Sequence, residues 1–199
     1  MYGRKQKKGF LISFMKQFFR ENSYNFVKCI LNQVAITMFG LMLAFATIQK
    51  ETYLLLSSLF SIAFYLFLTY YMFWEIGGKD RIAEDSGRKK KTPWKGFLIC
   101  LVANIPNILM GLIICFTKTA GMTYKFAGNI YVVVNMLARA FEAMYLGLIQ
   151  LYSPNNPIAF LLICLPAPIM AEFAYILGNH NFRISGLFGI KPNTKNQTK

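Results

Sequence analysis

The chain has 199 residues, of which 55% are hydrophobic and only 15% are charged, and its mean hydropathy is +0.39. Soluble domains carry about a quarter charged residues, so this composition argues against a water-soluble globular fold. The charges are unbalanced, with 22 Lys and Arg against 8 Asp and Glu and a formal net charge of +14. In a soluble protein this excess would indicate nucleic acid binding, so the positions of the charges decide the interpretation.

Residues 1–27 predict a basic arm followed by a helix that lies on a membrane surface. Between Gly9 and Tyr24, apolar side chains recur at helical spacing and are interrupted by Lys16 and Arg20. This pattern is typical of an interfacial amphipathic helix, whose basic side chains extend toward lipid phosphates. We do not expect a cleavable signal peptide, because the two basic residues interrupt the apolar run and no small-residue cleavage pattern follows.

Five apolar segments predict transmembrane helices, since about 20 residues are needed to cross a hydrocarbon core of roughly 30 Å. The apolar runs are continuous and lack the alternation of an outer-membrane barrel, which disfavours strands. The predicted fold is therefore an all-α, polytopic membrane helix bundle preceded by the interfacial helix. Its single domain covers residues 28–178, with spans at 29–47, 53–74, 96–116, 128–152 and 158–177.

The distribution of basic residues predicts the orientation of the bundle, because Lys and Arg near span ends are retained in the cytoplasm. Seven basic residues precede the first predicted span and seven lie in residues 79–95, whereas the connections on the other side carry three. We therefore expect a multi-pass protein of the plasma membrane with a cytoplasmic N-terminus. The positive net charge then reflects topology, and nucleic acid is not an expected partner.

Anionic lipid headgroups are the partner that this charge distribution predicts, because each basic residue near an anionic leaflet contributes about 1 kcal/mol of attraction. Residues 75–92 are too few to fold as a domain. We interpret them as a solvated linker that fixes topology, with a docking site for lipid or a partner protein as the alternative. The residues expected to contact headgroups are Lys16, Arg20, Arg88, Lys89, Lys90 and Lys91.

The C-terminal tail, residues 179–199, conflicts with five crossings. Five spans and a cytoplasmic N-terminus put the tail outside, yet it carries four basic residues. A re-entrant or interfacial segment at 128–152 would return the tail to the cytoplasm. We retain five spans in the prediction, because a hydrophobic helix of that length usually crosses the membrane.

Polar side chains inside three predicted spans form the candidate functional site. A charge at the centre of a bilayer costs at least about 2.5 to 3.5 kcal/mol, so such residues must face other helices or water. Those of the fourth span are spaced to line one narrow stripe of a helix. The cluster consists of Asn104 and Asn107 in the third span, Asn135, Arg139 and Glu142 in the fourth, and Glu172 in the fifth.

Helix geometry predicts that Arg139 lies between the two carboxylates of this cluster. If the fourth and fifth spans are antiparallel, Glu142 and Glu172 fall about 3 Å and about 6 Å from the midplane on opposite sides. One arginine with two carboxylates leaves an excess negative charge, so we expect one carboxyl, with Glu172 favoured, to be protonated or to bind a cation. A purely structural cluster that specifies helix pairing is the alternative.

No motif in the sequence predicts a cofactor, a metal site or catalysis. The four cysteines and the single histidine lack metal-ligand spacing, and the chain has no GxSxG or HExxH sequence. The favoured hypothesis is a noncatalytic membrane component, such as a scaffold, assembly factor or regulatory subunit, with a membrane-protein partner or a second copy bound to it. The alternative is a small carrier or substrate-binding transporter subunit that uses the polar cluster. An intramembrane enzyme is the least favoured class.

Overall fold

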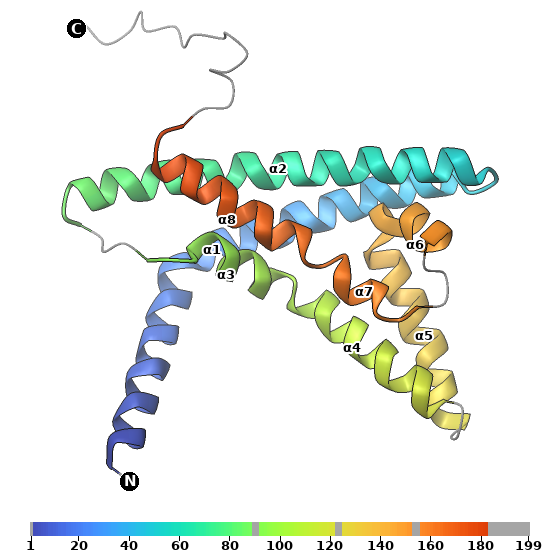
Figure 1. The fold of residues 1–199 in the computed structure, drawn as a ribbon, viewed down its shortest axis with the longest axis horizontal. Helices are drawn as coiled ribbons and strands as arrows, with labels where there is room; N and C mark the ends of the chain where they lie inside the picture. The colour runs from blue at the N-terminus through green and yellow to red at the C-terminus, as the bar shows by residue number, and fades with distance from the viewer. Residues whose placement is uncertain (1, 89–91, 122–124, 153–155, 183–199) are drawn as a thin grey trace, which may run out of the picture.

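The computed structural model describes the backbone of residues 2–88, 92–121, 125–152 and 156–182, and the side chains of these residues from Met15 onward. This part of the chain consists of helices and short connections and contains no strand, which confirms the predicted all-α fold. Figure 1 shows the path of the chain. The helices are α1 Tyr2–Thr47, α2 Glu51–Asp85, α3 Lys95–Ala103, α4 Ile105–Ala120, α5 Lys125–Phe141, the 3-10 helix η1 Ala143–Tyr145, α6 Leu146–Tyr152, α7 Ala159–Leu162 and α8 Pro166–Asn179.

Three helical segments of the described chain are long and apolar enough to cross a membrane. They are Met15–Thr47 of α1, the whole of α2, and Ala159–Asn179, which covers α7 and α8. Two further pairs reach that length only together and are bent, α3 with α4 by 58° and α5 with the segment of η1 and α6 by 83°. Four of the five predicted spans fall within one of these segments or pairs, and the fifth begins one residue before its segment, so length and composition support three to five spans.

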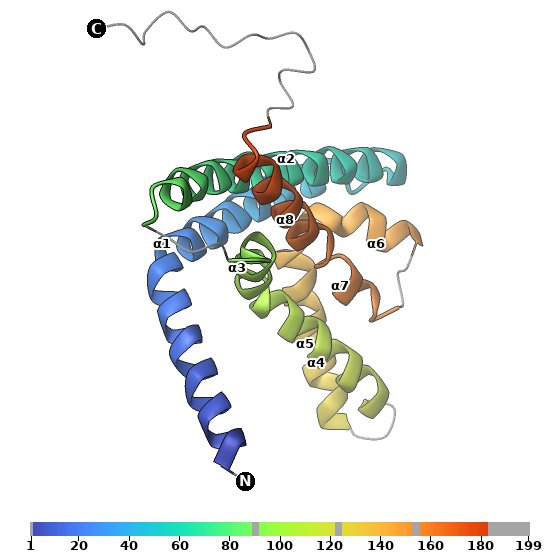
Figure 2. The same cartoon turned by 60° about the vertical axis from the view of Figure 1, so that its left-hand side comes forward.

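The predicted boundary between an interfacial helix and the first span is not a break, because α1 continues from Tyr2 to Thr47. Residues 10–39 contain neither Gly nor Pro, so nothing in the sequence ends the helix there. Figures 1 and 2 show that α1 changes direction instead. Its N-terminal part therefore points away from the pair that its second half forms with α2.

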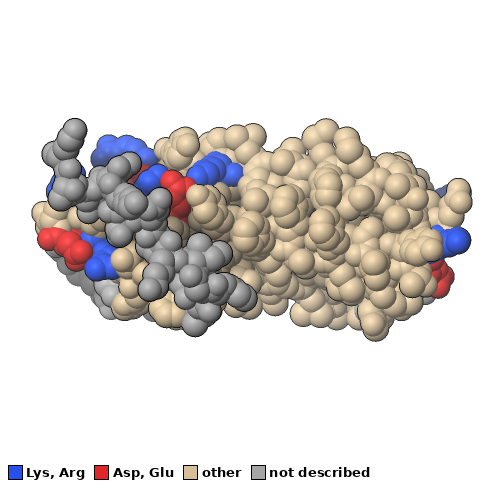
Figure 3. All heavy atoms as spheres, turned by 90° about the horizontal axis from the view of Figure 1, so that it is seen from above, with Lys and Arg blue, Asp and Glu red and all other residues tan. Residues whose placement is uncertain are grey.

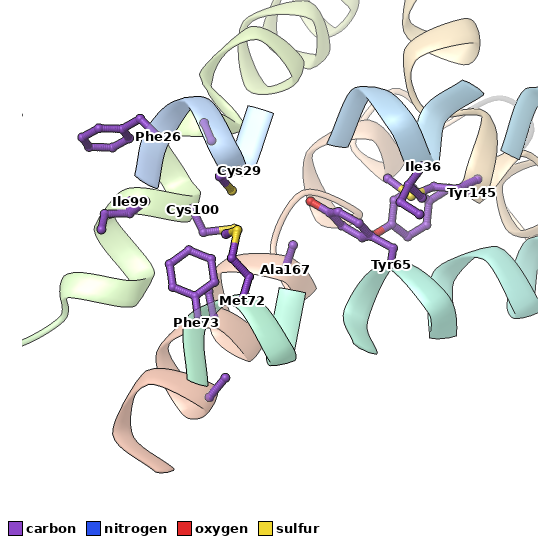
Figure 4. Close-up of a cluster of buried hydrophobic side chains, with 14 of the residues drawn as sticks. Phe26, Cys29, Ile36, Tyr65, Met72, Phe73, Ile99, Cys100, Tyr145 and Ala167 are labelled. Carbon is purple, nitrogen blue, oxygen red and sulfur yellow. The ribbon is translucent and has the colours of Figure 1, made fainter. Parts of the chain in front are cut away.

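Helix α2 is the element on which the other helices assemble. It contacts α1, α6 and α8, and α3 packs against both α1 and α8 (Figures 1 and 2). Near the start of α2, the backbone N–H of Gly147 in α6 donates to Ser58 Oγ at 2.8 Å. In its second half, Phe73 lies in the buried core with Cys29 of α1 and Cys100 of α3 (Figure 4).

The breaks between the helices have local physical causes. Pro106 has no N–H to donate to the carbonyl of Val102, and α3 gives way to α4 at this point, around Asn104. At the break after α5, the freed carbonyl of Phe141 accepts a hydrogen bond from Thr37 Oγ1 of α1 at 2.9 Å. A neighbouring helix thus replaces the lost backbone partner, as it must where water is excluded.

Charged side chains gather at the two ends of the elongated body, and the visible face between them is uncharged (Figure 3). Residues 52–74 of α2 contain no charged side chain and extend about 34 Å at helical rise, close to the thickness of a hydrocarbon core. We call the end where α2 finishes and α3 begins the loop end. There Lys28 of α1 lies 3.3 Å from Glu75 of α2, so the two predicted basic regions meet at this end.

The end of α8 also lies at the loop end. Asn179 Nδ2 donates to Glu84 Oε2 at 3.3 Å, and Trp74 Nε1 donates to the carbonyl of Phe182 at 2.8 Å. Five alternating crossings of straight helices would put these residues at opposite ends of the body. The 83° bend after α5 prevents the fourth segment from running straight along the body, and the side of the tail stays a prediction.

The contact between α2 and α8 depends on two glycines. A Cβ at Gly77 would collide with the backbone oxygen of Tyr175, and one at Gly178 would collide with that of Trp74. Small residues let the backbones of membrane helices approach closely in this way.

We expect Gly178→Ala to lower the midpoint of thermal unfolding in detergent micelles, because forcing a methyl group into a tight contact costs about 1 to 3 kcal/mol. Gly78→Ala is the matched control on the neighbouring helix, since a Cβ there meets nothing closer than 3.8 Å. Equal midpoints for the two variants would contradict the close contact.

Candidate functional site

The two asparagines of the third predicted span are buried at the break between α3 and α4. Asn104 Oδ1 accepts from Gln33 Nε2 of α1 at 3.2 Å, and its Nδ2 donates to the carbonyl of Cys100 at 2.9 Å. Asn107 is buried in the first turn of α4. Asn104 therefore links α1 to the break in the third segment.

Glu172 of α8 serves as a cap for another helix. Its Oε2 accepts from the backbone N–H of Phe97 at 2.9 Å. This N–H belongs to the first turn of α3, whose donors have no acceptor within the helix. Trp94, the residue before α3, makes no side-chain capping bond. A carboxylate at a helix N-terminus is also favoured by the helix dipole, so Glu172 stabilises the α3–α8 contact.

Arg139 and Glu142 lie on either side of the break that follows α5. Arg139 Nε donates to Asn135 Oδ1 at 3.3 Å, one turn earlier. Glu142 is only 2% exposed, and its Oε1 accepts from Cys164 Sγ at 3.4 Å. Its Oε2 and the hydroxyl of Tyr145 are buried without a hydrogen-bond partner in the described part of the chain.

These contacts distribute the predicted cluster over separate pairs of helices. Glu142 and Glu172 each have a partner other than Arg139, and the position of Arg139 between the two carboxylates stays a prediction. The depth estimate assumed a straight fourth span, and the chain bends by 83° at this point. Binding of a proton or cation at Glu172 stays a prediction.

A buried ion pair at the loop end was not predicted from the sequence. Lys95 Nζ lies 2.5 Å from Asp80 Oδ2, and the same oxygen accepts from Tyr175 Oη at 3.2 Å. The side chains of Lys95 and Asp80 are 7% and 9% exposed. The three residues connect α3, α2 and α8, and removal of one partner from such a pair leaves an uncompensated buried charge.

The spacing along α2 carries a signal that could have identified Asp80. Phe73, Gly77 and Asp80 lie four and three residues apart, so the buried face of α2 continues into the segment interpreted as a solvated linker. That segment is helical as far as Asp85. The burial of Lys95 has no comparable signal, because it depends on the position of α8.

A cavity of about 470 Å³ lies beside this ion pair, in the size range of small-ligand sites. Its wall is formed by α1, the end of α2, the residues around the start of α3, and α8, four elements that come together only in the folded chain. Both signs of charge line it. The polar residues of its wall include Glu21, Asn22, Asp80, Glu84, Arg88 and Lys95.

Of the residues expected to contact lipid headgroups, Lys16, Arg20 and Arg88 are described, and they lie at or near this end. Lys16 and Arg20 are exposed on α1. Arg88 is exposed, and its Nε donates to Ser86 Oγ at 2.8 Å. Lys89, Lys90 and Lys91 lie outside the described residues. Contact of this group with anionic headgroups stays a prediction.

Within the described ranges, no group of three or more His, Cys, Asp or Glu side chains could hold a metal ion. The cysteines are free thiols, and Cys29, Cys100 and Cys164 are buried among apolar side chains. Comparison of the chain with known protein families, with characterised proteins and with solved structures finds no match.

We expect Lys95→Met to lower the free energy of unfolding by about 3 to 5 kcal/mol, because the buried Asp80 carboxylate loses the ammonium group of Lys95. Lys79→Met is the control, since Lys79 is 72% exposed in its pair with Glu75 and exposed pairs contribute little. Denaturant-induced unfolding in detergent micelles measures both. Losses of similar size would contradict the burial of the Lys95 pair.

Proposed function

We propose that this protein is a small polytopic protein of the plasma membrane that acts as a noncatalytic component of a larger membrane assembly. A scaffold, an assembly factor and a regulatory subunit all fit this description. The proposal combines the location of the charges, the path of the helices and the use that the fold makes of its intramembrane polar groups.

The exposed apolar surface supports the membrane location. Leu56, Phe60 and Phe67 lie in the uncharged part of α2, and each is at least 60% exposed. Contiguous apolar surface of this kind is costly in water and favourable against acyl chains. The uncharged face between the two charged ends has the same explanation (Figure 3).

We propose four crossings, with the segment from α5 to α6 as a re-entrant element. Support comes from the 83° bend in that segment and from the position of Asn179 beside Glu84 at the loop end. The Lys and Arg residues of the loop end favour the cytoplasm for this end, and hence for the N-terminus. The four basic residues of the tail then agree with the same rule.

The noncatalytic role rests on one observation, namely that three polar side chains inside the predicted spans bind another side chain or the backbone. Asn104 binds Gln33, Glu172 binds the N–H of Phe97, and Glu142 binds Cys164. A carrier gathers such groups around a common site near the midplane of the membrane. In the described chain they are shared among several helix contacts, which favours a structural role over the carrier alternative.

The topology is tested with a reporter that is active only in the cytoplasm. We expect full activity for fusions at Met1 and at Lys199, because the proposed topology puts both termini in the cytoplasm. A fusion at Gln49, between α1 and α2, is the internal control and stays inactive. An active fusion at Met1 with an inactive one at Lys199 would restore five crossings and reject the re-entrant segment.

The assembly role is tested on the full chain, tagged and expressed at its natural level. After extraction in digitonin, we expect it to migrate above its own mass with one other membrane protein or a second copy in fixed ratio. Cross-linking in intact membranes should give the same pair. A chain that stays monomeric in digitonin and gives no cross-linked product in membranes would reject the assembly role.

A further inference from the structure

We propose that the cavity at the loop end binds a phosphoethanolamine group, and that the source of this group is a phospholipid headgroup. The lipid source rests on the proposed membrane location, whereas the chemistry of the group rests on the cavity alone. The cavity is defined by residues of four elements, so it exists only in the folded protein.

Two cations of the wall suit a phosphate. Lys95 is buried and lines the cavity, and its ammonium group uses one N–H on Asp80. An ammonium group has three donors, and the described residues accept from only that one. Arg88 uses its Nε on Ser86, which leaves the two terminal nitrogens of the guanidinium for a ligand. Two cations with unused donors on one wall fit a phosphate.

Two carboxylates of the wall suit a primary ammonium. Glu21 of α1 accepts from Gln17 through Oε1 at 2.8 Å, and Glu84 of α2 accepts from Asn179 through Oε2 at 3.3 Å. The second oxygen of each carboxylate can also accept a hydrogen bond. Because a primary ammonium carries three N–H donors, these oxygens can bind it directly. A trimethylammonium has no N–H and would leave both carboxylates without that bond.

Charges of both signs on the described wall favour a zwitterion over an anion. Lys95 pairs with Asp80, and Glu21, Glu84 and Arg88 line the same cavity. A ligand with only a phosphate would meet the carboxylates of Glu21 and Glu84, which have the same sign. A ligand with only an amine would meet Arg88 and the donors of Lys95. Phosphoethanolamine carries both charges and so has a group for the cations and a group for the carboxylates.

The depth of the cavity supports a lipid source. Lys95 directly precedes residues 96–117, which contain no charged side chain, and Asp80 follows the uncharged part of α2. In the proposed topology the cavity therefore lies at the level of the headgroups. Trp94 is 64% exposed beside it, and tryptophan prefers this level of a bilayer.

Native mass spectrometry of the purified full chain in micelles tests the proposal, with dioleoyl-phosphatidylethanolamine, -phosphatidylcholine and -phosphatidylglycerol as probes. We expect the ethanolamine lipid to bind about five- to tenfold more tightly than the other two. Glu21→Gln and Arg88→Gln should each remove most of this preference without moving the thermal midpoint, because neither side chain supports the core. Arg81→Gln is the matched control, since Arg81 lies near the end of α2, seven residues before Arg88, and pairs with Asp85 without lining the cavity.

Equal affinity for the three lipids, or an ethanolamine preference that survives both variants, would overturn the proposal. Tighter binding of phosphatidylglycerol would also overturn it and would indicate a basic surface without selection. Free glycerophosphoethanolamine tests whether the bound group comes from a lipid or from a soluble molecule. A lower affinity than that of the lipid supports a lipid headgroup, and an equal affinity rejects the lipid source. Recovery of the chain in the soluble fraction would reject the membrane location, and glycerophosphoethanolamine binding would still test the cavity.

Discussion

The close contact between α2 and α8 is the constraint on which the loop end depends. Gly77 and Gly178 let the two backbones meet, and this contact brings Tyr175 to Asp80 and Asn179 to Glu84. It also carries Glu172 to the start of α3, and α3 in turn supplies Lys95 to the ion pair. The same contact also brings together the α2 and α8 residues that line the cavity. Larger residues at the two glycines would therefore disturb the cap, the ion pair and the cavity together.

Broken helices inside a membrane require partners for their freed backbone groups, and this chain provides them from neighbouring helices. Thr37 of α1 donates to the carbonyl exposed after α5, and Glu172 of α8 accepts from the first turn of α3. Asn104 joins α1 to the break before α4. These three residues explain why polar side chains persist in apolar segments without a ligand. Glu142 is different, because its second oxygen has no partner among the described residues.

The helices could be predicted from the sequence because their signal is local. Charge-free stretches of sufficient length define the apolar segments, and Pro106 marks the break between α3 and α4. The bend at Glu142 could not be predicted, since no Gly or Pro marks it. The partners of Glu172 and Lys95 could not be predicted from the sequence either. A depth estimate gives the height of a residue along the membrane normal and does not identify its neighbours around the helix. Tertiary contacts decide those neighbours.

The ion pairs of the loop end affect the charge and the topology differently. Lys28 and Lys79 pair with Glu75, Arg81 pairs with Asp85, and Lys95 pairs with Asp80. Part of the basic charge near this end is thus neutralised within the fold, which weakens its attraction for anionic lipids. Orientation is unaffected, because it follows the number of Lys and Arg residues during insertion and acidic residues contribute little. The end stays basic by count and can face the cytoplasm, while the carboxylates on the cavity wall give a zwitterionic headgroup a partner for its ammonium.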